Sequence, residues 1–84
     1  MNRFKEKDKV WCIALKEDNS CYFAKEGIIR EIFISGNNEE FAIIVDEDGN
    51  SALLLTKDCY KDKKDAEYIC NKGNNILRKL YEYI

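Results

Sequence analysis

The apolar residues in the last third of the chain recur every three or four positions, which is the spacing of one face of an α-helix. They begin at Ala66 and continue at Ile69, Cys70, Gly73, Ile76, Leu77, Leu80, Tyr83 and Ile84. Asp62 precedes them and is a favoured N-cap residue. Gly73 falls on the apolar face, where its missing side chain allows another element to approach closely. The pattern therefore predicts one amphipathic helix over about residues 62–84, with Gly73 as the place of any bend.

Ahead of this helix, short runs of β-branched and aromatic residues predict strands. The runs cover residues 9–15, 27–35, 40–46 and 51–56. Residues 21–26 are ambiguous and are expected in a partly extended loop. Residues 27–35 carry apolar side chains on both faces, which predicts a bend or a bulge. The pair Asp48-Gly49 is a strong hairpin signal. Short strands joined by tight turns favour a mainly β fold with one helix, in which a small antiparallel barrel or curled sheet is covered by that helix.

The length of the chain allows one domain only. Its 84 residues bury about 60–65% of the surface that the unfolded chain exposes, so the core is thin. We expect the barrel over about residues 8–60. No apolar run reaches the length of a membrane span, and the basic start of the chain leads to no apolar signal segment. The sequence therefore predicts a cytoplasmic protein without a membrane partner.

Four segments follow one another in a characteristic layout: "KDKVWCI", "EGIIREIFI", "FAIIVDEDG" and "DCYKDKKDAEYI". This layout resembles that of small SH3-like barrel proteins encoded by phages and mobile elements of low-GC Gram-positive bacteria. The matching positions are Asp8, Lys9, Val10, Glu26, Gly27, Ile29, Ile32, Phe41, Ile43, Asp48, Gly49, Asp58, Cys59, Tyr60, Asp62, Asp65 and Ala66. Three positions depart from the pattern, with Cys59 for a branched aliphatic residue, Asp62 for Ser or Thr, and Lys64 for Glu. The resemblance implies an SH3-like barrel of four to five strands with a C-terminal helix, and it implies little about activity.

The absence of histidine removes most catalytic and metal chemistry from consideration. A nucleophile needs a neighbouring base, and neither a Cys–His nor a Ser–His pair can form. Zinc sites need ligands two to four residues apart, whereas Cys12, Cys21, Cys59 and Cys70 are much farther apart in the chain. Without a secretion signal these thiols are expected to be reduced. We therefore expect no enzyme, no catalytic residue, no metal and no cofactor.

Large aromatic side chains are more numerous than a thin core can bury, and aromatic residues are common anchors of protein interfaces. A cluster of lysines precedes the predicted helix. The candidate partner-binding residues are Trp11, Tyr22, Phe23, Lys61, Lys63, Lys64 and Tyr81. These residues favour a non-catalytic binding module that contacts a host protein, such as a phage or mobile-element protein that occludes a host defence factor.

Three alternatives remain open from the sequence. The basic and aromatic residues are also compatible with a small barrel that binds nucleic acid, although acidic residues interleave with every basic run and the net charge is −2. Sequestration of a small signalling ligand is a second alternative. The helix end "ILRKLYEYI" is compatible with a homodimer through the C-terminal helix.

Overall fold

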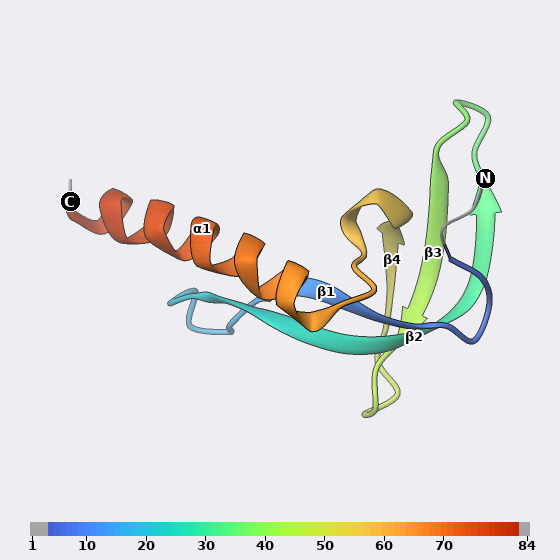
Figure 1. The fold of residues 1–84 in the computed structure, drawn as a ribbon, viewed down its shortest axis with the longest axis horizontal. Coiled ribbons are helices and arrows are strands. Elements are labelled where there is room, and N and C mark those ends of the chain that lie inside the picture. Colours follow the sequence, from blue (N-terminus) through green and yellow to red (C-terminus); the bar gives the residue numbers. More distant parts are fainter. Residues whose placement is uncertain (1–3, 83–84) are drawn as a thin grey trace.

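A computed structural model describes residues 4–82 and shows four strands followed by two helical elements (Figure 1). The strands are β1 (Lys9–Leu15), β2 (Tyr22–Ile34), β3 (Glu40–Val45) and β4 (Ser51–Leu55). A 3₁₀ turn, η1 (Thr56–Asp58), and the helix α1 (Lys63–Glu82) complete the chain. The α+β fold and the order of strands before a C-terminal helix are confirmed. Tyr83 and Ile84, which the periodicity places at the helix end, lie outside the described residues.

The four strands form one antiparallel sheet in the order β1-β2-β3-β4. β2 serves both halves of this sheet, because its residues up to Ile28 pair with β1 and its residues from Ile28 onward pair with β3. The register shifts between Ile29 and Glu31, so a bulge lies at Arg30, where the strand bends. The bend predicted within residues 27–35 is confirmed. The expected loop over residues 21–26 is wrong, because Tyr22 to Glu26 form the first part of β2.

The sheet stays open, so the expected closed SH3-like barrel is not confirmed. After β4, η1 turns the chain back, and Tyr60 forms an isolated bridge with Trp11 of β1. The Trp11 N–H donates to the Tyr60 carbonyl at 2.7 Å, and the Tyr60 N–H donates to the Trp11 carbonyl at 2.9 Å. α1 begins at Lys63, which leaves too few residues for a fifth strand between η1 and the helix. In the part of the chain that the structure describes, a single bridge therefore joins β1 to the segment after η1, where a barrel would need a full ladder of hydrogen bonds between strands.

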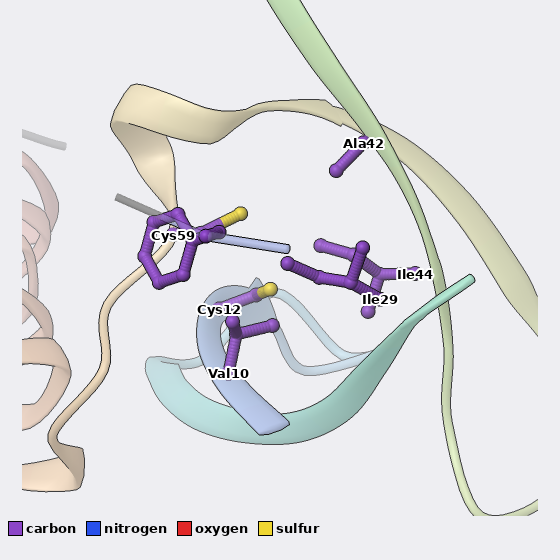
Figure 2. Close-up of a cluster of buried hydrophobic side chains, with 7 residues drawn as sticks. Val10, Cys12, Ile29, Ala42, Ile44 and Cys59 are labelled. Carbon is purple, nitrogen blue, oxygen red and sulfur yellow. The ribbon is translucent and has the colours of Figure 1, made fainter. Parts of the chain in front are cut away.

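The core is small and lies inside the bend of the sheet (Figure 2). Its buried members come from β1, β2, β3 and two flanking segments, namely Val10, Cys12, Ile29, Ala42, Ile44, Phe4 and Cys59. Gly27 lies at the corner of the bend, where an added Cβ would overlap the Cγ2 atom of Ile44. The glycine therefore lets β2 pass close to β3.

α1 packs along the β1–β2 half of the sheet and extends away from this core (Figure 1). Val10 and Cys12 face the core, so Trp11 between them faces away from it, and the Lys63 ammonium of α1 lies over the Trp11 ring at 5.3 Å. Ala66 and Cys70 are the buried residues of the helix. The helix was expected to cover the open side of a barrel, but it contacts β2 and β1 and contributes no residue to the buried cluster.

One side chain anchors α1 to the start of β2. The Tyr22 N–H donates to Oδ1 of Asn74, and Nδ2 of Asn74 donates to the Tyr22 carbonyl at 3.1 Å. Gly73 lies against the same residue, because a Cβ there would be 2.8 Å from Cδ2 of Tyr22. The helix runs unbroken through Gly73. Gly73 and Asn74 are both poor helix formers, and they are the residues through which the helix docks on β2.

Replacing Asn74 tests this anchor. Asn74→Ala removes both hydrogen bonds and leaves the half-buried Tyr22 backbone without these partners, so the free energy of unfolding should fall by about 1–2 kcal/mol. The matched control is Asn75→Ala on the neighbouring exposed position, which should be neutral or slightly stabilising because alanine favours helices. Urea unfolding followed by circular dichroism measures both. Equal effects of the two substitutions would contradict the anchor.

Gly27 gives a second test of the packing. Gly27→Ala forces Ile44 or the β2 backbone to move and should cost about 1–3 kcal/mol of stability. Gly36→Ala is the control, because an added Cβ there meets no atom within 4 Å, and it should change stability by less than about 0.5 kcal/mol. Thermal unfolding of the two variants compares them directly. A tolerated Gly27→Ala would show that the corner has free space.

Candidate functional site

The lysines singled out from the sequence lie near the start of α1 and differ in what they contact. Lys63 lies over Trp11, and the Lys61 ammonium lies 5.7 Å from the centroid of the Phe4 ring. Lys64 is exposed. Two of the three lysines are thus held over aromatic rings, an arrangement that stabilises a cation by contact with the ring face.

The aromatic candidates lie along the seam between α1 and the β1–β2 hairpin. Tyr22 is half-buried beneath Gly73, and its backbone is held by Asn74. The Tyr81 hydroxyl donates to the carbonyl of Asn19 in the hairpin loop at 3.2 Å. Phe23 remains partly exposed. The structure brings Trp11 and Lys63 together, but it uses Tyr22 and Tyr81 to hold the helix, and the seven candidates do not form one surface.

A different apolar surface lies on the β2–β4 half of the sheet. Ala42 and Ile44 of β3 face the core, so the alternate residues of β3 face outward. Their partners in the register lie on the same outward face. We call this surface the outer sheet face, and its members are Ile28, Phe33, Phe41, Ile43, Val45, Leu53 and Leu55.

The outer sheet face is continuous across three strands. Phe41 pairs with Phe33 on one side and with Leu55 on the other, and the rings of Phe33 and Phe41 stack with centroids 5.7 Å apart. Ile43 pairs with Leu53. Leu53 is 58% exposed and Phe33 is 39% exposed. Such a contiguous apolar area, left open to solvent over residues 4–82, is typical of an interaction surface.

Carboxylates lie beside this surface, mainly at the two turns that bound β3. Glu31 projects onto the face itself, opposite Ile43. The two turns that bound β3 add Glu39 at one end, and Glu47 and Asp48 at the other, all of them exposed. The neighbouring cations are Arg30 at the bulge, Lys57 in η1, and Lys7 and Lys9 beside Ile28, of which Lys9 is paired with Glu26. The negative part of the rim therefore lies at the two turns that bound β3.

An ion pair fixes the β3–β4 turn beside the core. The Lys25 ammonium lies 2.8 Å from Asp46, whose side chain is 7% exposed. Asp46 also accepts hydrogen bonds at 2.9 Å from the backbone N–H groups of Asp48 and Asn50. The hydrogen bond from Lys25 holds the pKa of Asp46 below its ordinary value, and the same contact raises the pKa of Lys25.

A cavity of about 240 Å³ opens next to this ion pair, on the inner side of the bent sheet. Its lining comes from β1, β2 and the β3–β4 hairpin, and is mainly apolar, with Cys12, Ala14, Ile44, Ala52 and Leu54 among the lining residues. Lys25 also lines it, but its charge is matched by Asp46. The cavity therefore suits a small or weakly polar group better than an anion.

The Asp46–Lys25 pair predicts a specific pH dependence. The folded-state pKa of Asp46 is below the unfolded value of about 3.9, so its stabilising effect is present above that pH and is lost as the pH falls further. Asp46→Asn and Lys25→Met should each flatten the decline of Tm between about pH 5 and 2. The double variant should add nothing further. Independent, additive effects of the two substitutions would exclude the pairing.

Two kinds of site are absent from residues 4–82. No group of three or more His, Cys, Asp or Glu residues is placed to hold a metal ion. In the same part of the chain, α1 is too polar to cross a membrane as a helix.

The sequence does contain a signal for the outer sheet face. The segments "FAIIV" and "LLL" are apolar on both faces of their strands, which is typical of strands that are covered on two sides. A chain with one helix covers only part of such a sheet. From the pattern alone these segments are predicted as strands, and the pattern does not show which of their faces stays uncovered.

Comparison with known proteins gives no relative: no protein-family model matches the chain, and neither curated proteins nor solved structures give a significant match.

Proposed function

We propose that the protein is a non-catalytic binding module that acts by protein–protein contact through the outer sheet face. The observation that carries this proposal is the uncovered apolar surface of seven side chains across β2, β3 and β4. Burial of apolar side chains such as Leu53 and Phe33 supplies the driving force for association. The stacked pair Phe33–Phe41 at its centre provides the aromatic anchors that interfaces favour.

The fitting partner is an amphipathic helix of another protein whose apolar stripe is flanked by basic residues. The same sheet already takes an amphipathic helix along its β1–β2 half, where α1 buries Ala66 and Cys70. The strand β2 runs from this half into the half whose outer face is uncovered. The rim residues Glu31, Glu39 and Glu47 of that face complement lysine and arginine residues on the partner.

The proposal also covers the origin of the protein and its similarity to SH3-like barrels. We infer an SH3-like protein of phage or mobile-element origin that occludes a host factor. The SH3-like part of this inference is supported by the long bent strand β2 shared by two half-sheets and by the return of the chain onto β1 at Tyr60 after a 3₁₀ turn. The proposed origin is supported by the sequence layout from "KDKVWCI" to "DCYKDKKDAEYI". In this view the barrel is partly closed by a single bridge.

The alternatives have less support. Nucleic-acid binding would use Lys61 and Lys63, but both lie over aromatic rings and are interleaved with Asp62 and Asp65. An anionic signalling ligand would need an unpaired cation in the cavity, whereas Lys25 is paired with Asp46. A homodimer through α1 has an apolar stripe available, because Ile76 is 67% exposed and Leu80 is also exposed.

Leu53→Lys tests the outer sheet face against the helix stripe. Leu53 is exposed, so the substitution should leave the fold intact while placing a charge within the apolar surface. The matched control is Ile76→Lys on α1. Both variants and the wild type are used as baits in nuclease-treated lysate of a low-GC Gram-positive bacterium, and recovered proteins are purified and titrated by calorimetry. Leu53→Lys should weaken binding at least tenfold, and Ile76→Lys should not.

Each alternative has its own readout in this experiment. Loss of binding with Ile76→Lys alone would move the interface to α1, and a concentration-dependent dimer of the wild type in light scattering that Ile76→Lys disrupts would identify a second copy as the partner. Equal binding of wild type and Leu53→Lys would overturn the outer sheet face. Salt-dependent binding of a labelled DNA duplex at micromolar protein would favour the nucleic-acid alternative.

A further inference from the structure

Two buried cysteines face each other across the bridge that joins the chain after η1 to β1. Trp11 and Tyr60 exchange both backbone hydrogen bonds, so they form a hydrogen-bonded antiparallel pair. The next pair in this register is Cys12 with Cys59, and the backbone of Cys59 is extended. Directly opposed residues of this non-hydrogen-bonded kind have Cα atoms about 4.5 Å apart, within the range of about 4.4–6.8 Å that disulfides span.

The two thiols also contact each other. Both belong to the buried cluster, and Figure 2 shows their sulfur atoms within it. A hydrogen bond between the two thiols lowers the pKa of Cys12, against the opposing effect of burial, and the Cys59 thiol also donates to the Leu55 carbonyl at 3.7 Å. A lowered pKa increases the fraction of thiolate, which is the form that reacts with oxidants. Of the two thiols, Cys12 is therefore the better suited to react with an oxidant, and Cys59 lies directly beside it.

The cavity gives a small reagent access to Cys12. This cysteine is 9% exposed and lines the cavity of about 240 Å³ on the inner side of the sheet. That space suits a hydroperoxide better than a large disulfide reagent such as oxidised glutathione. Cys59 is fully buried, so it is reached only through Cys12.

We propose that Cys12 and Cys59 form a hydroperoxide-sensitive dithiol that closes covalently over the bridge. The Cys12 thiolate attacks one oxygen of hydrogen peroxide, and the O–O bond breaks to give a sulfenic acid and hydroxide. The Cys59 sulfur then attacks the Cys12 sulfur, the S–O bond breaks, and water leaves. In total two thiols and one peroxide give one disulfide and two waters, so the sulfurs lose the two electrons that the peroxide gains.

The disulfide would lock the part of the fold that a single bridge now holds. It joins β1 to the segment after η1 and encloses β2, β3 and β4 in one covalent loop. Closing a loop of this size restricts the unfolded chain strongly. The site is independent of the outer sheet face, because Cys12 and Cys59 lie on the core side of the sheet.

Peroxide titration of the folded, reduced wild-type protein tests this site. After quenching and denaturation, the number of free thiols should fall from four to two, and the intact mass should fall by two hydrogen atoms. Peptide mapping should place the bond between Cys12 and Cys59. Tm should rise by more than about 10 °C and return to its starting value with a reductant.

Two variants provide the controls. Cys21→Ser with Cys70→Ala removes the other two thiols, which lie near each other, and should leave the reaction unchanged, since neither belongs to the buried cluster that holds Cys12 and Cys59. Cys59→Ala should stop at the sulfenic acid on Cys12, which dimedone traps. Four thiols remaining in the wild type after peroxide, or a bond mapped to Cys21 and Cys70, would overturn the proposal. A mapped Cys12–Cys59 bond without a rise in Tm would overturn the locking role. The wild-type mapping decides the matter even where a variant fails to fold.

Discussion

The bend of β2 is the constraint on which the rest of the fold depends. A bulge at Arg30 turns one strand so that its first half pairs with β1 and its second half with β3. Gly27 allows the close approach to Ile44 that this turn requires. The bend creates an inner side, and seven buried residues fill it. Because only four residues separate η1 from α1, the inner side is closed by one bridge at Tyr60 rather than by a further strand in the described part of the chain.

The position of α1 determines what remains exposed. The helix is anchored by Asn74 to the backbone of Tyr22, which directs it along the β1–β2 hairpin. Figure 1 shows the helix extending away from β3 and β4. The outward side of these strands is apolar, but no second helix follows to cover it in the described part of the chain. An interaction surface is therefore a consequence of where the single helix docks.

The sequence predicted which strands and helices form better than it predicted which contacts their residues make. The spacing from Ala66 to Leu80 predicted α1, and the two-faced pattern of residues 27–35 predicted the bend, because both depend on local periodicity. The first part of β2 was missed because its strand character depends on pairing with β1, which is not visible locally. Tyr22 was predicted to contact a partner, and the structure adds a contact that the local sequence does not show, because the Tyr22 backbone is bonded to Asn74, 52 residues farther along the chain. The outer sheet face depends on the helix position and was missed for the same reason.

The most direct test is photochemical carbene footprinting of the free protein and of its complex with the partner. Phe33 and Leu53 should be labelled in the free protein at every concentration. The partner should protect these two residues while Ile76 stays labelled. Protection of Ile76 with continued labelling of Leu53 would contradict binding of another protein through the outer sheet face, because the interface would then lie on α1. Protection of Leu53 in the free protein as its concentration rises would equally contradict it, because a second copy would then cover the sheet.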